Sequence, residues 1–214
     1  MIVDQDVLEK SLQKALELKR KRNFKESVDL IVVLKDIDLK GPEGRIREVV
    51  ELPHPPKKEV TICVVADGDM ALQAKKMGLR VVTRDELQQM DKKAAKKLAK
   101  RCDWVLVKTD LMGLAGRILG PALGPRGKAP IPVPPNAPLE AFVKKYQRSV
   151  NVRVRKQPQV MCRIGTEDMS PKELAENAMA VISALERKLP NPQNQIAEVI
   201  VKTTMGQPVL AKAR

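Results

Sequence analysis

The chain of 214 residues is 43% hydrophobic and 2% aromatic, and its formal net charge is +14. This composition excludes a disordered chain, predicts an aliphatic core, and leaves room for one large domain or two modest ones. The excess of basic residues favours a polyanionic partner, namely RNA, DNA or an anionic membrane surface. No stretch reaches the ~20 apolar residues of a membrane span, so no membrane insertion is expected.

The first two elements are predicted to be a helix and a strand. Apolar residues at helical spacing predict a helix from Asp4 to Arg22, and the basic residues 19–22 at its end suit the helix dipole. Residues 27–39 are rich in apolar, β-branched side chains, and every second residue from 28 to 34 is apolar. This pattern predicts a strand whose buried face consists of Val28, Leu30, Val32 and Leu34.

Turn and break signals follow this strand. Glycines and a proline at 41–44 predict a turn, after which residues 45–53 predict a second, antiparallel strand. The proline-containing segment 54–58 then breaks the pattern, and we expect a hinge there.

The middle of the chain alternates strands with helices, which predicts a parallel sheet with right-handed crossovers. The continuous apolar run at 60–66 is typical of a strand covered on both faces. A single helix is predicted for residues 84–101, and a further strand at 102–107. Residues 121–138 are so rich in proline and glycine that we expect a long loop, and loops of this length are often functional.

The C-terminal part predicts a strand, a helix and a strand after a second hinge near residue 157. Residues 169–189 form the clearest helix pattern, because Ser170 and Glu173 make a capping box and the apolar residues keep helical spacing. The last strand ends in a Thr-Thr-Met-Gly tip at 203–206.

The two chain ends are each too small to bury a good core alone, so we expect them to combine. The predicted fold class is therefore α/β and α+β in two domains, a split α+β domain from both chain ends and an inserted α/β domain. Residues 1–58 plus 157–214 make the split domain, and residues 59–156 make the inserted one.

Catalytic and nucleotide-binding patterns are missing from the sequence. A P-loop needs Ser or Thr after Gly-Lys, but Gly127-Lys128 is followed by Ala129. His54 is the only histidine and lies in a loop segment, which leaves no evident base for a nucleophile. We predict a protein that is not an enzyme and has no cofactor.

Three cysteines, Cys63, Cys102 and Cys162, lie far apart and lack C-x-x-C pairing. A metal site or a disulfide framework is therefore not expected, and we interpret the cysteines as buried thiols in a reducing cytosol.

Basic residues gather in runs. The run at 92–101 has six cations and no acid, and is either a solvated helix face or a binding face. Arg117, Arg126 and Lys128 add an acid-free basic loop, which is a good surface for contacts with phosphates. Proteins that bind single-stranded nucleic acids usually stack the bases on aromatic side chains, and this chain has only four aromatic residues. A folded RNA, which is recognised by shape, sugar hydroxyls and phosphates, is therefore a better candidate partner than a single strand.

Three separated segments resemble one family. The sequence GRILGPALGPRGKAPIPVPPNA from residue 116, NFKESVDLIVVL from residue 23 and the terminal TTMG are similar to the L1 family of large-subunit ribosomal proteins, and to its archaeal branch in particular. The resemblance spans essentially the whole chain. One departure is Ala129, where family members with this loop typically carry Met.

The resemblance implies a structural protein of the large ribosomal subunit in the cytoplasm, with a Rossmann-like inserted domain. It implies binding to the stalk region of 23S-type ribosomal RNA near the tRNA exit site. It also implies contact with exit-site tRNA, a role in tRNA release, and repression of translation through a similar fold in the protein's own mRNA. No membrane partner is implied.

The resemblance also implies an RNA-binding surface in the split domain. Carried over by position, this surface comprises Phe24, Lys25, Ser27, Asp29, Arg163, Gly165, Thr203, Thr204, Met205 and Gly206. Arg117, Arg126 and Lys128 are expected to make secondary RNA contacts, and no residue is expected to bind a metal. Two alternatives stay open from the residues alone, a nucleotide-dependent enzyme built on the α/β middle and a DNA-architectural protein outside the ribosome.

Overall fold

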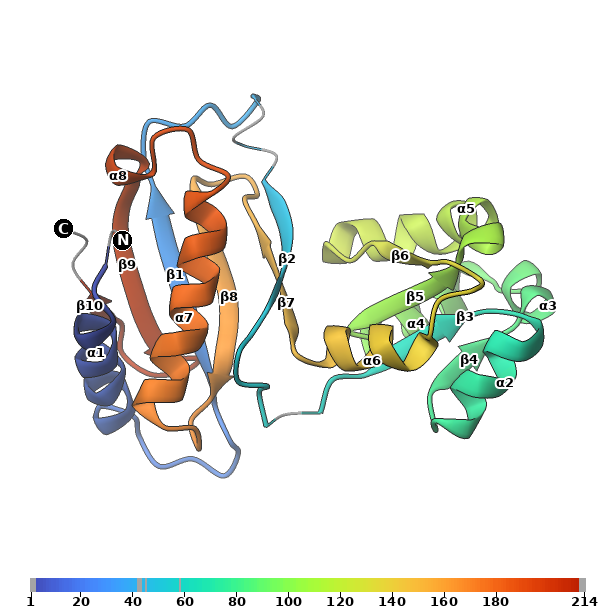
Figure 1. The fold of residues 1–214 in the computed structure, drawn as a ribbon, viewed down its shortest axis with the longest axis horizontal. Coiled ribbons are helices and arrows are strands. Elements are labelled where there is room, and N and C mark those ends of the chain that lie inside the picture. Colours follow the sequence, from blue (N-terminus) through green and yellow to red (C-terminus); the bar gives the residue numbers. More distant parts are fainter. Residues whose placement is uncertain (1–2, 42–43, 45, 58, 212–214) are drawn as a thin grey trace. The chain divides into compact units, whose positions relative to one another are not determined.

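The computed structural model describes residues 3–41, 44, 46–57 and 59–211, which form two compact units (Figure 1). Met1–Lys58 and Arg148–Arg214 make the first unit, and Glu59–Gln147 makes the second. The chain re-enters the first unit at Arg148, earlier than the predicted boundary at 157. The reason is that β7 (Ser149–Arg153) pairs antiparallel with β2 (Arg47–Glu51), so residues 148–156 do not belong to the inserted segment.

The first unit is built on a four-stranded sheet in the order β10-β9-β1-β8. All of its neighbouring strands are antiparallel, and the central pair joins segments from the two ends of the chain. The strands are β1 (Ser27–Leu34), β8 (Gln159–Thr166), β9 (Ile196–Thr203) and β10 (Val209–Ala211). The helices are α1 (Gln5–Glu17), α7 (Pro171–Glu186) and α8 (Pro192–Gln195).

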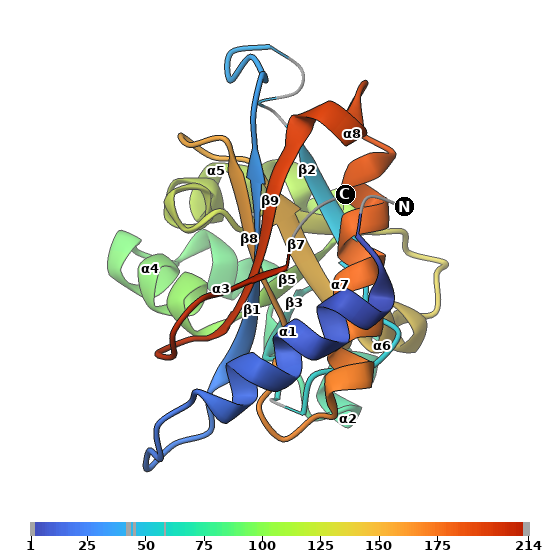
Figure 2. The same ribbon diagram turned by 90° about the vertical axis from the view of Figure 1, so that its left-hand side faces the viewer.

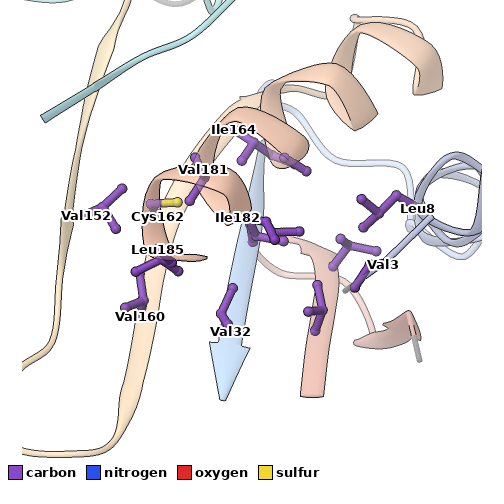
Figure 3. Close-up of a cluster of buried hydrophobic side chains, with 14 of the residues drawn as sticks. Val3, Leu8, Val32, Val152, Val160, Cys162, Ile164, Val181, Ile182 and Leu185 are labelled. Atoms are coloured by element: carbon purple, nitrogen blue, oxygen red, sulfur yellow. The ribbon is translucent and has the colours of Figure 1, made fainter. Parts of the chain in front are cut away.

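Strand β1 confirms the predicted alternation, since Val28, Leu30, Val32 and Leu34 are buried and the residues between them are half-buried. Its inner face shares one hydrophobic core with α1 and α7, which lie against each other over one side of the sheet (Figure 2). Aliphatic side chains from both chain ends interlock in this core (Figure 3). Helix α7 has the predicted capping box of Ser170 and Glu173.

Two predictions for the first unit differ from the structure. Helix α1 ends at Glu17, so the basic residues 19–22 lie beyond its last turn and the helix dipole does not account for them. Strand β2 is antiparallel, but to β7 and not to β1. The predicted turn at 41–44 lies partly outside the described residues.

The second unit contains a parallel four-stranded sheet in the order β4-β3-β5-β6. Every residue of β3 is buried, as the continuous apolar run predicts. Side chains of β3 alternate between two cores, one shared with α2 and α6 and the other with α3, α4 and α5, so helices cover both faces. The strands are β3 (Ile62–Val65), β4 (Arg80–Val82), β5 (Trp104–Lys108) and β6 (Pro130–Val133). The helices are α2 (Gly68–Lys76), α3 (Arg84–Gln88), α4 (Lys92–Arg101), α5 (Met112–Leu123) and α6 (Leu139–Gln147), with short 3-10 turns at η2 (Thr109–Leu111) and η3 (Gly124–Arg126).

The prediction of a long loop at 121–138 was wrong, because the end of α5, the turn η3 and strand β6 lie in this segment. Helix α5 continues through Pro121 to Leu123, because Leu119, Ala122 and Leu123 are buried in the core and outweigh one lost hydrogen bond. Strand β6 contains two prolines, which its position at the edge of the sheet tolerates.

The helix predicted for residues 84–101 is in fact two helices, α3 and α4. The break falls at Asp91, whose side chain accepts a hydrogen bond from the N–H of Ala94 (2.7 Å) and starts α4 as its N-cap.

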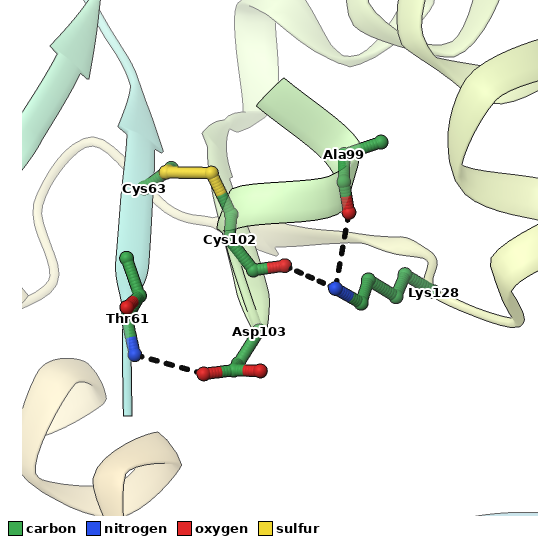
Figure 4. Close-up of a disulfide and its surroundings, with 6 residues drawn as sticks. All are labelled: Thr61, Cys63, Ala99, Cys102, Asp103 and Lys128. Carbon is green, nitrogen blue, oxygen red and sulfur yellow. Dashed lines mark hydrogen bonds between the residues drawn. A yellow bond between two sulfur atoms is a disulfide. The ribbon is translucent and has the colours of Figure 1, made fainter. Parts of the chain in front are cut away.

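A disulfide joins Cys63 on β3 to Cys102 at the end of α4 (Figure 4). The expectation of three buried thiols was therefore wrong for two of them. Parallel strands bring residues distant in sequence together, and here the Cα atoms lie 5.7 Å apart. Cys162 remains a buried free thiol, and burial raises its pKa to about 12. None of the described helices is long and apolar enough to cross a membrane.

Candidate nucleic-acid interface

The turn that follows β9 lies against the start of β1. The N–H of Thr204 donates to the carbonyl of Ser27 (2.9 Å), and its hydroxyl lies 3.1 Å from the same oxygen and 3.0 Å from a carboxylate oxygen of Asp29. In Figure 2 this turn and the segment leading into β1 emerge at the same end of the sheet. The structure thus brings two predicted groups of site residues, 24–29 and 203–206, to one place.

A buried carboxylate, Glu26, holds this turn in position. Its side chain accepts a hydrogen bond from the N–H of Met205 (2.9 Å) and pairs with Nε of Arg22 (2.8 Å). Burial alone would raise the pKa of Glu26, but the hydrogen bond from Met205 and the charge of Arg22 outweigh it and lower the pKa. Glu26 is therefore ionised at neutral pH and fixes the backbone of the turn.

Phe24 and Met205 are the large apolar side chains that this surface exposes, at 56% and 57%. Thr204 is also exposed, but Thr203 is fully buried, so its side chain does not reach the surface. A Cβ at Gly206 would lie 2.2 Å from the hydroxyl oxygen of Thr203, so packing within the turn itself requires glycine here. Of the predicted Thr-Thr-Met-Gly tip, Thr204 and Met205 are the side chains available to a partner.

Asp29 lies between two basic residues on neighbouring strands. It pairs in register with Arg163 on β8 and with Lys202 on β9. Burial raises the pKa of Asp29, and the hydrogen bond from Thr204 and the two positive charges offset only part of this effect. The carboxylate of Asp29 can accept a hydrogen bond from a ribose hydroxyl, and Arg163 and Lys202 on either side of it can bind phosphates.

The remaining predicted residues of this surface divide between solvent and core. Lys25 is exposed and pairs with Asp168 (3.2 Å), and Ser27 is half-buried at the start of β1. Gly165 is buried, and a Cβ there would lie 2.4 Å from a methyl carbon of Leu174. Its glycine therefore serves the packing of α7 on the sheet.

The sequence of the whole chain, compared with known families, agrees with this arrangement. A model of the Ribosomal protein L1p/L10e family matches residues 12–207. The chain belongs to this family. Because the family consists of ribosomal proteins, its membership confirms the prediction of a protein that is not an enzyme.

Members of the L1p/L10e family from archaea are similar to this chain over nearly its full length. The large ribosomal subunit protein uL1 of Hyperthermus butylicus is 61% identical over 214 residues, covering 99% of each chain. The uL1 protein of Aeropyrum pernix is 59% identical, covering 94% of this chain and 93% of its own. That of Staphylothermus marinus is 57% identical, covering 94% of both. These similarities confirm the archaeal type that the sequence resemblance indicated.

The second unit of this L1p/L10e member has an ion pair where open parallel sheets usually bind ligands. Such ligands bind at the carboxyl ends of the strands where the strand order reverses, here between β3 and β5. Nζ of Lys108 lies there, 2.6 Å from Asp67 and 3.3 Å from Asp110. The hydrogen bond from Lys108 lowers the pKa of Asp67 and keeps it charged. Two carboxylates at this position disfavour a nucleotide phosphate.

The three secondary RNA-binding residues predicted for the second unit have different surroundings. Arg117 is exposed on α5, and the guanidinium of Arg126 donates to the carbonyl of Ala122 (3.1 Å). Nζ of Lys128 donates to the carbonyls of Ala99 (3.0 Å) and Cys102 at the end of α4 (Figure 4). Burial lowers the pKa of Lys128. Lys128 therefore caps the C-terminus of α4, a structural role that Arg117 and Arg126 do not share.

Glu26 and Arg22 are the residues of the first-unit surface that the sequence reasoning missed. A signal for Glu26 was present, because it continues the inward series of Val28, Leu30 and Val32 by one step of two residues. A carboxylate at an inward position of an alternating strand needs partners, and these are the N–H of Met205 and the guanidinium of Arg22.

Proposed function

We propose that this protein is a structural constituent of the large ribosomal subunit and binds folded 23S-type ribosomal RNA through its first unit. The relatives named large ribosomal subunit protein uL1 support the first part of this proposal. The observation that carries the second part is the turn at 204–206, which Glu26 and Ser27 fix so that Met205 and Thr204 face outward.

A surface that is fixed before binding suits a folded RNA. The backbone of the turn loses little freedom on binding, because its N–H groups are already bonded to the protein. Met205 and Phe24 offer apolar contact to riboses or bases, while Asp29 and Arg163 offer a hydroxyl acceptor and a phosphate donor. The few aromatic side chains make shape and sugar contacts more important than stacking.

The wider role that we propose follows the family resemblance. The RNA is the mobile stalk region near the tRNA exit site, where the protein contacts exit-site tRNA and takes part in its release. The protein also represses translation by binding a similar fold in its own mRNA. It acts in the cytoplasm on the ribosome. The two units are proposed to be separate domains, the second Rossmann-like, linked by a hinge that lets the second follow the stalk.

Met205→Asp and Thr204→Val test the proposed surface. Binding of a stalk fragment of 23S-type RNA should weaken at least tenfold for each variant, because the first places a carboxylate against RNA and the second removes the hydroxyl beside Asp29. Met161→Asp is the matched control, since Met161 on β8 is exposed to 56% against 57% for Met205. Equal binding by Met205→Asp and Met161→Asp, with both folded, would contradict the assignment of the turn. Tighter binding to duplex DNA than to the stalk RNA at the same salt concentration would contradict the proposal that the partner is RNA.

A further inference from the structure

Helix α4 exposes six basic side chains and no acidic one. They form two parallel rows, Lys92, Lys96 and Lys100 in one and Lys93, Lys97 and Arg101 in the other. Neighbours within a row are four residues and about 6 Å apart along the helix axis. Within the part of the chain that the structure describes, none of the six forms a side-chain hydrogen bond or an ion pair.

This arrangement costs the free protein stability. Like charges four residues apart occur four times along the two rows, and each such pair destabilises a helix by about 0.2–0.5 kcal/mol. Lys92 and Lys93 also lie in the first turn, where the helix dipole disfavours cations, and the turn itself contains no acidic residue beyond the N-cap Asp91. The dipole therefore accounts only for Lys100 and Arg101 in the last turn.

The helix that carries these charges is held at both ends. Asp91 caps its N-terminus, and Lys128 donates to two carbonyls at its C-terminus. The disulfide of Cys102 then fixes the end of the helix to β3 (Figure 4). The inner face packs into the core through Ala95, Leu98 and Ala99. The backbone that carries the two rows of cations is therefore rigid, so binding costs little backbone freedom.

The composition of the exposed face selects the partner. It contains lysines, one arginine and Ala94, with no aromatic or large aliphatic side chain, so it lacks the anchors of protein interfaces and of membrane-surface helices. Its Lys and Arg side chains can read guanine edges only in an open major groove, and the deep, narrow major groove of an RNA helix excludes them, which leaves the phosphates. Regularly spaced point charges match a regularly spaced row of phosphates, and a member of a ribosomal protein family meets such rows in RNA helices.

We propose that the exposed face of α4 binds the phosphate backbone of double-helical RNA, independently of base sequence. This site is separate from the surface at the turn of β9 in the first unit, and it does not depend on the RNA specificity proposed for that surface.

The test uses the full chain, a perfectly paired RNA duplex of arbitrary sequence, and three variants. Lys93→Gln/Lys97→Gln/Arg101→Gln removes one row of α4. Lys75→Gln/Lys76→Gln/Arg80→Gln is the matched control, because it removes the same charge from exposed residues of α2 and β4, and α2 covers the opposite face of the sheet. Met205→Asp places a carboxylate on the turn of the first unit and so disrupts the RNA-binding surface proposed there.

The α4 variant should bind the duplex on the order of a hundredfold more weakly at 0.1 M salt, and the slope of log affinity against log salt should fall by about 3. The control and Met205→Asp should lose little. Equal losses in the α4 variant and the control would overturn the proposal, since they would show a net-charge effect. Loss of duplex binding in Met205→Asp, or α4-dependent binding to phosphatidylserine vesicles with none to the duplex, would also overturn it. Binding of the stalk RNA, measured on the same proteins, tests separately the RNA-binding surface proposed for the first unit.

Discussion

Reduction of the disulfide is expected to weaken the second unit selectively. Cys63 and Cys102 are 39 residues apart, and both side chains are fully buried. Closing a loop of this size in the unfolded chain removes conformational freedom that corresponds to about 4 kcal/mol at 25 °C. The two thiols stay buried in the reduced native state, so the effect lies mainly in the unfolded chain. Reduction should therefore lower the free energy of unfolding of the second unit by about 3–4 kcal/mol.

Trp104 allows the second unit to be measured alone, because it is the only tryptophan and lies on β5. Urea unfolding followed by its fluorescence, with and without reductant, gives the difference in free energy. Cys63→Ala/Cys102→Ala should unfold like reduced protein and be insensitive to reductant. Cys162→Ala, which removes the free thiol of the first unit, should respond to reductant like the unmodified chain. A difference below about 1 kcal/mol between oxidised and reduced protein would refute the loop-entropy reasoning.

Two further predictions concern the first unit. Glu26→Gln should destabilise it by about 1–3 kcal/mol at pH 7, because a charged hydrogen-bond acceptor is lost. Since the pKa of Glu26 is lowered on folding, its contribution is present above the ordinary value of 4.5 and is lost as the pH falls through the lower folded value, so the two proteins should converge there in chemical unfolding. Gly165→Ala should cost about 1–3 kcal/mol in the same assay, because the new Cβ would lie 2.4 Å from Leu174 and 2.7 Å from the sulfur of Met169. An unchanged free energy of unfolding in Gly165→Ala would show that these two side chains move away without cost.

Local patterns predicted the elements whose determinants are local. The alternation from Val28 to Leu34 and the capping box of Ser170 each depend on residues a few positions apart, and both are confirmed. Strand β6 was missed because its prolines argue against a strand, and only its position at the sheet edge permits them. The disulfide was missed for a related reason, since no local pattern shows that β3 and the end of α4 meet.

The candidate site shows the same division. The resemblance indicated the exposed Met205 and Thr204, but it could not separate them from Thr203, which is buried, or from Gly165, which packs against α7. Burial is a property of the folded sheet and depends on residues far away in sequence. Glu26 was also missed, although the sequence held a signal for it, because it continues the inward alternation of β1 by one step.

The split organisation of the first unit also imposes an order on its synthesis. Strand β1 ends at Leu34, yet it forms its sheet with β8 and β9, which begin at Gln159 and Ile196. The second unit, in contrast, is continuous from Glu59 to Gln147, so all of its strands are synthesised before β8 begins. Strand β1 can pair with β8 once the chain has been synthesised past Thr166, but its other neighbour, β9, is complete only at Thr203. The turn that we propose to bind RNA then comes into being only with the last strands, so unfinished chains cannot compete for the RNA site.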